Sequence, residues 1–277
     1  MKALSRVQEG TAMSEPVLEQ VERFALVVRP DPQSQVTAER LRVLLIRCGC
    51  REDARDPDAV IVVGGDGTFL YAVHLYLNDL ARVTFIGVHT GTLGFFMDYQ
   101  DNNIEEFVTD LLQGHLPIEV YPMLQAETGE HTFYAMNEVR VENPIRTQRI
   151  RVRLDGDQFE DYRGTGLCIS TQLGSSALNR SLGGALLQKG LHAFELTEIA
   201  GLHHRAYRSL GSPFVMSDET CIEFESDNFS GAILGADSDY LQMSGPGCIR
   251  IFKSEKKRIH ILRGKKVTYF QRLERLF

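Results

Sequence analysis

The sequence has 277 residues, a length that suits one large domain or two of moderate size. It is 43% hydrophobic and 24% charged, the composition of a globular protein with a real core. The net charge of −7 argues against a general nucleic-acid-binding protein, which usually carries a basic excess. No apolar run reaches the ~18 residues that a membrane-spanning helix needs. We therefore expect neither nucleic acid nor a membrane as a partner.

The cysteines are odd in number and their spacing fits neither a zinc site nor a disulfide framework. We interpret them as reduced thiols of a cytoplasmic protein: Cys48, Cys50, Cys168, Cys221 and Cys248. Residues 1–16 are mixed and polar, and we expect them to be flexible.

Residues 17–115 are expected to form an α/β nucleotide-binding domain around a parallel, Rossmann-like sheet. Apolar runs that predict buried strands alternate here with segments of helical spacing. The β-branched run 59–63 is typical of a strand that is buried on both faces. The predicted strands cover 24–28, 59–63 and 83–88, and the predicted helices cover 41–48, 70–77 and 104–112.

Residues 116–254 are expected to form a second, β-rich domain. Alternating apolar and polar residues predict half-buried strands, and glycine-containing turns separate several of them. We also predict one helix near residues 183–200. The strand candidates are 118–126, 132–142, 150–154, 213–225, 231–234, 247–252 and 258–262.

A glycine-rich loop, Gly64-Gly65-Asp66-Gly67-Thr68, follows the buried strand 59–63 directly. Ligands of open α/β sheets bind at the carboxyl ends of strands. Glycines allow the backbone to approach a bulky anion, and the free N–H groups at the start of the next helix can bind phosphate oxygens. The loop is not a Walker A motif, because no Gly-Lys-Ser/Thr follows.

Asp66 is the unusual member of this loop, because a carboxylate is electrostatically unfavourable among groups that bind phosphate. It could accept a proton from an attacking hydroxyl, or it could lie beside a magnesium ion. It could also be a turn residue that caps the next helix.

Two further short motifs contain polar groups suited to a nucleotide. Asn137-Glu138 offers an amide and a carboxylate, which can bind two ribose hydroxyls. Gly174-Ser175-Ser176 offers small hydroxyl side chains beside glycine, which suit phosphate or ribose. A pair of surface residues and a plain turn are the alternatives at these two places.

Together and in this order, these motifs resemble the NAD kinase family, particularly its short bacterial form. Residues 64–70 are similar to the family's GGDGTFL, residues 88–96 to its (N/H)TGxLGF(Y/L) loop, and residues 137–138 to its NE pair. Residues 162–184 are similar to its RGDGL…STPTGSTAYNxSxGG block. The resemblance covers about residues 58–215, although GGDGT alone is shared with diacylglycerol and sphingosine kinases.

The resemblance implies a two-domain NAD kinase-like fold in which a C-terminal tail, about 255–277, returns to the first domain. It implies ATP as the phosphoryl donor with magnesium, NAD as the acceptor, and assembly as homodimers or homotetramers. Asp66 would accept the proton of the 2′-hydroxyl of the adenosine ribose, and Asn137 and Glu138 would hold ribose hydroxyls. Phe95 and Phe96 would flank the adenine. The remaining nucleotide-binding positions are Gly64, Gly65, Gly67, Thr68, Arg163, Thr165, Leu173, Gly174, Ser175, Ser176, Ala177, Leu178, Asn179, Ser181 and Ala200.

The chain departs from the family pattern at three of these positions. Thr165 replaces an aspartate, Leu173 lies in the segment that replaces the family's PTG, and Leu178 replaces an aromatic residue. These departures, and the sharing of the GGDGT loop with other kinases, leave two other functions open. One is a dinucleotide-binding regulator with little or no activity, and the other is a lipid or small-molecule kinase that uses the same GGDGT loop.

The C-terminal tail is basic. Its lysines and arginines could steer anionic substrates, but we favour a solvated face. These residues are Lys253, Lys256, Lys257, Arg258, Arg263, Lys265 and Lys266.

Overall fold

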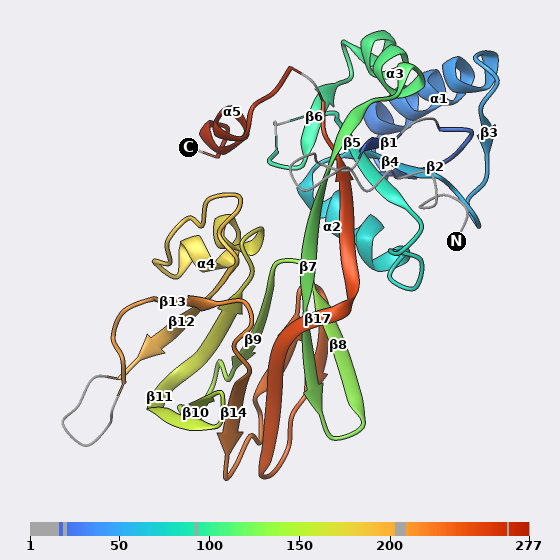
Figure 1. Cartoon of the computed structure of the whole chain (residues 1–277). Helices are drawn as coiled ribbons and strands as arrows, with labels where there is room; N and C mark the ends of the chain where they lie inside the picture. The colour runs from blue at the N-terminus through green and yellow to red at the C-terminus, as the bar shows by residue number, and fades with distance from the viewer. Residues whose placement is uncertain (1–16, 19–20, 92–93, 203–208, 265, 277) are drawn as a thin grey trace. The chain divides into compact units, whose positions relative to one another are not determined.

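The computed structural model describes residues 17–18, 21–91, 94–202, 209–264 and 266–276 (Figure 1). The chain forms two compact units, Met1–Tyr121 with Lys256–Phe277, and Pro122–Glu255. The unit boundaries fall inside the long strands β7 (Leu116–Thr128) and β17 (Gly247–Leu262). The flexibility expected for residues 1–16 lies outside the described residues.

The first unit is built on a parallel sheet, as the sequence predicts. Its strands run in the order β3 (Arg51–Glu52), β2 (Arg23–Val28), β4 (Ala59–Gly64) and β5 (Thr84–His89). The other edge of β5 pairs in parallel with β6 (Met97–Gln100) and with β17 at Ile261. Every residue of β4 is buried, so the prediction of a strand covered on both faces is confirmed.

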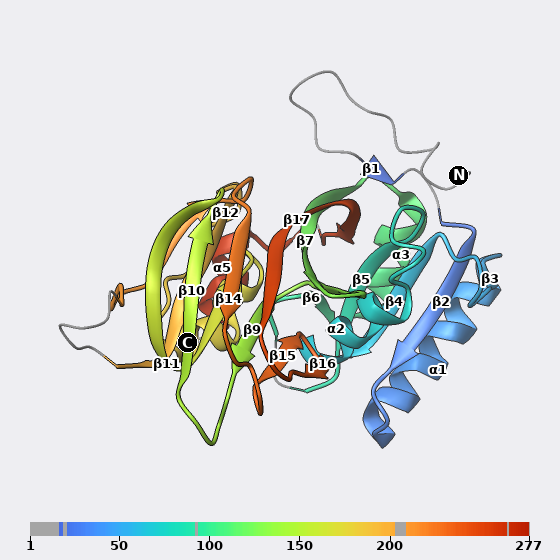
Figure 2. The same ribbon diagram turned by 90° about the horizontal axis from the view of Figure 1, so that it is seen from below.

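Three helices cover this sheet. Figures 1 and 2 show α1 (Pro32–Arg47) and α3 (Ile104–Gln113) on one side and α2 (Asp66–Leu75) on the other. Helix α1 begins where the Asp31 side chain accepts a hydrogen bond from the Ser34 amide, and Gly49 follows its end at φ 92°. The helix predicted over 41–48 begins earlier than expected, at Pro32.

The end of the chain is attached to the first unit by buried ion pairs. Arg263 donates to Glu119 at 2.6 Å, and Arg272 donates to Asp98 at 3.3 Å and to Glu119 at 3.1 Å. Arg272 belongs to the short helix α5 (Tyr269–Glu274). The expectation of a solvated basic tail is therefore wrong for Arg263, whose charge is compensated by two buried carboxylates. Lys265 lies outside the described residues.

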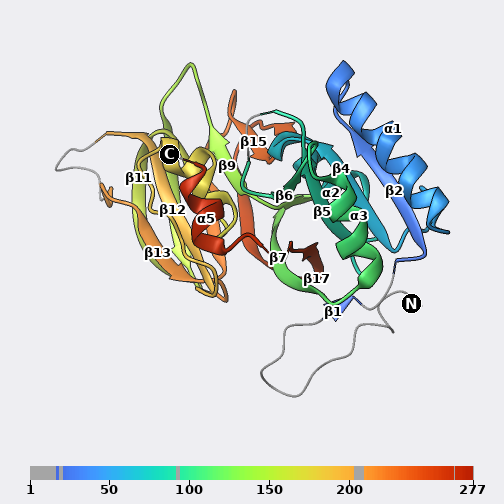
Figure 3. The same ribbon diagram turned by 90° about the horizontal axis from the view of Figure 1, so that it is seen from above.

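The second unit is an antiparallel β structure with its own hydrophobic core, which includes Tyr162, Phe194, Phe224 and Phe229. The strands pair in the order β13, β12, β11, β10, β14 and β17. Strand β11 also pairs with β9, β9 pairs with β15, and β15 pairs with β16. Figure 3 shows β11, β12 and β13 side by side. The strands are β8 (His131–Ala135), β9 (Glu138–Glu142), β10 (Gln148–Leu154), β11 (Asp157–Ser170), β12 (Ala193–Gly201), β13 (Phe214–Ser217), β14 (Ile222–Ser226), β15 (Ile233–Ala236) and β16 (Asp239–Gln242).

The helix predicted near residues 183–200 is wrong. The chain forms a short 3₁₀ turn (Gly174–Ser176) and one helical turn, α4 (Leu178–Ser181), and residues 193–201 are strand β12. Gly183 and Gly190 adopt φ values of 86° and 89°, which end helical structure, and β12 gains strand partners on both sides. Each of the predicted strands 132–142 and 213–225 is divided into two strands in the structure. The predicted strands 247–252 and 258–262 are joined in the single strand β17.

Candidate active site

The glycine-rich loop lies between β4 and α2, at the carboxyl end of a central parallel strand. Gly65 is the N-cap residue of α2, and Asp66 is the first residue of that helix. A Cβ atom at Gly64 would lie 2.6 Å from Thr68 Oγ1, so a larger residue would collide with the start of the helix. Among the described residues nothing lies within 4 Å of a Cβ built at Gly65 or Gly67. This side of the loop therefore has space for a ligand to approach the backbone.

The Asp66 carboxylate is held by the loop that follows β5. The backbone N–H of Phe95 donates to Asp66 Oδ2 at 2.8 Å, and that of Phe96 donates to Oδ1 at 3.0 Å. A Cβ at Gly94 would lie 2.2 Å from Asp66 Oδ1, so only glycine allows this approach. Among the described residues no side-chain hydrogen bond caps α2, so Asp66 does not have the capping role that the sequence left open. An ionised carboxylate has about four lone-pair positions, so Asp66 can still accept a proton.

Phe95 and Phe96 are buried in an aromatic cluster. The Phe96 ring stacks on Phe69 with centroids 5.0 Å apart, and Phe95 meets Phe96 edge-on at 5.4 Å. Tyr269 of α5 contacts Phe95 edge-on at 6.1 Å. The C-terminal tail thus contributes directly to the surroundings of this loop. Thr92 and Leu93 of the same motif lie outside the described residues.

Asn137 and Glu138 lie in the second unit, where β8 gives way to β9. The connection between the two strands is stabilised by Asp237, which is distant in sequence. Its carboxylate accepts hydrogen bonds from the backbone N–H groups of Met136, Asn137 and Glu138 at 2.7, 2.8 and 3.2 Å. Asp237 is buried and adopts φ 51°, which is rare for a residue other than glycine. The Asp237 carboxylate therefore orients the Asn137-Glu138 backbone.

Glu138 and Asn137 each present an acceptor without a donor. Glu138 is only 6% exposed, and Glu138 Oε2 and Asn137 Oδ1 are buried without a hydrogen-bond partner in the described part of the chain. Burial, and secondly the charge of Asp237, raises the pKa of Glu138 to about 7, although Arg140 at 3.4 Å opposes the shift. Buried acceptors of this kind are satisfied at low cost by hydroxyl donors of a ligand.

The Gly174–Ser176 turn packs directly against this pair. The Thr171 N–H donates to the Asn137 carbonyl at 2.8 Å, and the Thr171 hydroxyl donates to the Met136 carbonyl at 2.6 Å. A Cβ at Gly174 would lie 2.0 Å from the Asn137 carbonyl oxygen. The structure therefore brings together two of the predicted motifs, and glycine is required where they meet.

Several predicted site residues in and after this turn already form hydrogen bonds within the protein. The Ser175 hydroxyl donates to the Gln172 carbonyl, and the Ser176 hydroxyl donates to the Leu173 carbonyl. Asn179 is fully buried: its amide donates to Glu195 at 2.8 Å and accepts from Thr197 at 2.6 Å. Ala177 and Leu178 are half-buried and Ser181 is exposed.

Arg163, Thr165 and Ala200 lie at one end of the paired strands β11 and β12, where Gly164 faces Gly201. Arg163 and Thr165 are half-buried, and Ala200 is exposed with φ 48°. The structure thus brings predicted site residues together around Asp66 in the first unit and around Asn137 in the second, whereas Arg163, Thr165 and Ala200 lie farther along β11 and β12 from Ser170, the residue that pairs with Glu138.

Comparison with known proteins identifies the family of this chain. A model of the ATP-NAD kinase N-terminal domain matches residues 13–116. The NAD kinase of Lysinibacillus sphaericus is 33% identical over 264 residues, which cover 92% of this chain and 98% of that protein. The chain belongs to the NAD kinase family. The NAD kinase of Geobacillus stearothermophilus is 39% identical over 206 residues, or 72% of this chain and 76% of that one. The resemblance seen in the motifs is confirmed.

Solved structures of the family share the fold. Yeast NADH kinase in complex with NADH superposes with a TM-score of 0.83 at 16% identity, covering 96% of this chain and 91% of the other. An NAD kinase from Archaeoglobus fulgidus in complex with ATP gives a TM-score of 0.73 at 23% identity, covering 92% and 98%. The predicted fold, an α/β N-terminal domain followed by a β-rich domain, is confirmed.

The described residues contain no cluster of three or more His, Cys, Asp or Glu side chains arranged to hold a metal ion. A magnesium ion here would fit only if phosphate oxygens and water supplied most of its ligands, which is how Mg²⁺ is usually bound beside nucleotides. Within the same described residues, no helix has the length and apolar character needed to cross a membrane.

Sequence reasoning missed four residues that shape the two groups: Gly94, Thr171, Asp237 and Tyr269. Gly94 and Thr171 lie inside recognised motifs, so their proximity to Asp66 and Asn137 could have been suspected. Asp237 is 100 residues from Asn137, and Tyr269 is in the tail. No local pattern in the sequence connects these two residues to the motifs they contact.

Proposed function

We propose that this NAD kinase family member transfers the γ-phosphoryl group of ATP to the 2′-hydroxyl of the adenosine ribose of NAD and so forms NADP. The observation that carries the proposal is the Asp66 carboxylate, fixed by two backbone N–H groups in a glycine-rich loop that is open to a ligand. Family membership supplies the substrate pair. We assign residues 17–115 to nucleotide binding and residues 116–254 to NAD binding.

In the proposed reaction Asp66 accepts the proton of the 2′-hydroxyl as that oxygen bonds to the γ-phosphorus. The bond from the γ-phosphorus to the bridging oxygen breaks, and ADP leaves with that electron pair. Positioning and charge stabilisation account for most of the catalysis in such a transfer. Magnesium, carried by the nucleotide, would neutralise the phosphate charges near Asp66.

We propose that Asn137 and Glu138 bind ribose hydroxyls of NAD. Their acceptors without a partner among the described residues, Asn137 Oδ1 and Glu138 Oε2, would each accept a hydrogen bond from a ribose hydroxyl. We assign the further contacts to Phe95 and Phe96, to the backbone of residues 173–181, and to Arg163, Thr165 and Ala200. Leu178 offers no aromatic face, so we expect weaker stacking with the dinucleotide than an aromatic residue would give.

We further propose that the protein is cytoplasmic and acts as a homodimer or homotetramer. The five cysteines are all free thiols, which supports a reducing compartment. The oligomeric state rests on the family resemblance.

The test is a coupled assay of NADP formation with ATP and magnesium, run beside calorimetry with NAD. We expect turnover that requires both substrates, together with saturable NAD binding. NAD binding without turnover would contradict the proposal and indicate a dinucleotide-binding regulator. Phosphorylation of a lipid in place of NAD would indicate a lipid kinase.

A further inference from the structure

The two backbone donors that hold Asp66 belong to a segment that the end of the chain contacts. Phe95 and Phe96 donate one N–H group each to the two oxygens of Asp66. Such a carboxylate is oriented only as well as its donors are, so contacts that fix this segment also fix Asp66. Met97 and Asp98, which follow the two donors directly, are buried. Their hydrogen bonds are therefore the next link in the support of Asp66.

The C-terminal tail supplies hydrogen bonds to both of these residues. The Arg275 guanidinium donates to the Met97 carbonyl at 2.9 Å. The Gly264 N–H donates to Asp98 Oδ2 at 2.9 Å, and Arg272 donates to Asp98 Oδ1 at 3.3 Å. A Cβ at Gly264 would lie 3.1 Å from the Cβ of Asp98, so the two stretches of chain approach closely. The tail therefore binds the residues that follow the donors of Asp66.

Arg275 is held in place by the helix before it. It follows α5 directly, and it is half-buried. Within α5, Arg272 is only 3% exposed and donates to the buried carboxylates of Asp98 and Glu119. This helix is thus anchored independently of Arg275. Because a charged N–H donor forms a stronger hydrogen bond than a neutral one, the Arg275 bond can restrain the Met97 carbonyl.

Strand β5 contacts the same segment and is the alternative means of holding it. Met97 pairs with Gly87, and a Cβ at Gly87 would lie 3.1 Å from the Phe96 carbonyl. The register of this pairing shifts between Gly87 and Val88. Such a shift disrupts the strand ladder locally. Support from β5 is therefore weakest where Phe96 and Met97 lie, which is where Arg275 adds its bond.

We propose that Arg275 is a positioning residue of the phosphoryl transfer. Its bond to the Met97 carbonyl fixes the backbone of Phe95 and Phe96, and through it the orientation of the Asp66 carboxylate. The proposal rests on the proposed function of Asp66 as the proton acceptor. It gives the tail a part in turnover that requires no contact between Arg275 and either substrate.

Hydrogen exchange on the full chain tests the structural part of the proposal without any assay of activity. Mass spectrometry of a peptide that contains Phe95 and Phe96 measures it. Arg275→Met removes the donor and keeps an apolar stem, so the amides of this peptide should exchange about tenfold faster than in wild type. Arg275→Lys keeps a charged donor and should restore part of the protection. Unchanged exchange in Arg275→Met would overturn the proposal and leave β5 as the support of the segment.

Steady-state kinetics with ATP and NAD test the functional part. In Arg275→Met, kcat should fall about tenfold, which is part of the roughly 100-fold loss that a misplacement of about 1 Å causes. The Kd for NAD should change less than about threefold, and Arg275→Lys should recover part of the lost kcat. Calorimetry also gives the fraction of chains that bind NAD, so kcat is expressed per binding-competent chain and a loss of folded protein does not imitate the effect. Wild-type kcat in Arg275→Met would overturn the proposal.

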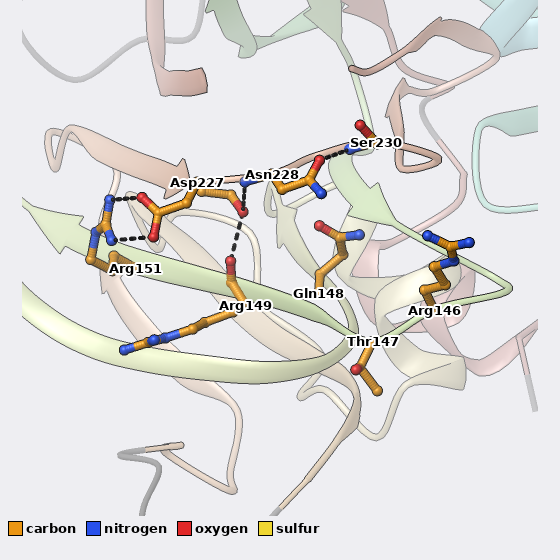
Figure 4. Close-up of a pocket in the computed structure, with 9 residues that line it drawn as sticks. Arg146, Thr147, Gln148, Arg149, Arg151, Asp227, Asn228 and Ser230 are labelled. Carbon is orange, nitrogen blue, oxygen red and sulfur yellow. Dashed lines mark hydrogen bonds and ion pairs between the residues drawn. The ribbon is translucent and has the colours of Figure 1, made fainter. Parts of the chain in front are cut away.

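Arg151→Met is the matched control. Arg151 is also half-buried, and it bonds Asp227 in the β-rich unit at 3.0 and 3.3 Å (Figure 4). Its loss should change neither the exchange of the Phe95 and Phe96 amides nor kcat, and an equal fall of kcat in both variants would overturn the proposal. If wild type itself does not phosphorylate NAD, the proposed function fails, whereas exchange still decides whether Arg275 holds the donors of Asp66.

Discussion

Backbone N–H donors hold one carboxylate in each unit, Asp66 in the first and Asp237 in the second, but the second unit also has the buried carboxylate of Glu138. In the first unit both oxygens of Asp66 receive a hydrogen bond, from Phe95 and Phe96. In the second unit Asp237 takes the backbone donors, and Glu138 beside it is buried with one oxygen that has no hydrogen-bond partner among the described residues.

This difference suggests a division of labour. A partly exposed carboxylate that the main chain holds in one position is suited to receiving a proton at a defined place. A buried acceptor without a donor is suited to binding, because a ligand hydroxyl supplies what the fold does not. We therefore expect changes around Asp66 to act on turnover, and changes around Glu138 to act on NAD affinity and on stability.

Among changes that leave the Asp66 side chain itself intact, the largest effect is expected from Gly94→Ala, which would place a Cβ 2.2 Å from Asp66 Oδ1 and displace the carboxylate without removing it. Turnover should fall about 100-fold, the effect of misplacing a reacting group by roughly 1 Å. Steady-state kinetics with ATP and NAD measure it. Gly247→Ala is the control, because a Cβ there makes only ordinary contact at 3.5 Å. Equal turnover in both variants would contradict a fixed role for Asp66.

Asp237→Asn should act on the binding group. The amide can accept fewer of the three backbone N–H groups, so we expect a loss of about 2 kcal/mol in the free energy of unfolding. The KM for NAD should rise while kcat changes little. Urea denaturation and steady-state kinetics measure the two effects, with Asp157→Asn at an exposed position as control. A fall in kcat at unchanged KM would argue against a positioning role.

The titration of Glu138 gives a pH-dependent prediction. Its folded-state pKa of about 7 lies above the ordinary value of 4.5, so its protonated form favours folding. This contribution is present below about pH 4.5 and is lost as the pH rises through 7. As the pH rises from about 5.5 to 8, titration of Glu138 should lower the free energy of unfolding of the wild type by about 2 kcal/mol. Glu138→Gln has no such group and should not undergo this loss.

Thermal unfolding across this pH range checks the prediction for Glu138. The stability of the variant relative to wild type should increase with pH, whereas Glu130→Gln, at an exposed position, should track wild type. A difference between wild type and Glu138→Gln that stays constant with pH would show that Glu138 titrates normally.

Leu178→Tyr is expected to have the smallest effect. The half-buried leucine stands where the family has an aromatic residue, and a ring would add a stacking surface worth about 1 kcal/mol. The Kd for NAD should fall about fivefold, with Leu178→Met as the control for size. If calorimetry shows equal affinity for both variants, this position does not stack on the dinucleotide.

Local sequence patterns were enough to predict the frame of the first group. The apolar run 59–63, the glycines after it and the helix beyond are all encoded within residues 59–75, so strand, loop and helix follow from propensity and periodicity. Because Asp66 follows the strand directly, its place at the sheet edge could be predicted too. Its bonds to the N–H groups of Phe95 and Phe96 depend on how two strand ends meet in space.

Long-range packing accounts for what the sequence did not predict. Asp237 reaches Asn137 across 100 residues, and Arg272 reaches Asp98 across 174, so neither contact leaves a local pattern. The helix predicted near residues 183–200 overlaps residues 193–201, which pairing with β11 and β13 makes a strand. Tertiary pairing overrides weak local preference in such segments.

The central claim is that Asp66 acts on the proton of the acceptor hydroxyl and not on NAD binding. Asp66→Asn tests it most directly, by kcat for NADP formation and the Kd for NAD measured on the same preparation. We predict that kcat falls by about 10³-fold, within the range for loss of a general base, while the Kd changes less than about threefold. A variant that keeps wild-type kcat, or that loses NAD binding to the same extent as turnover, would contradict the account.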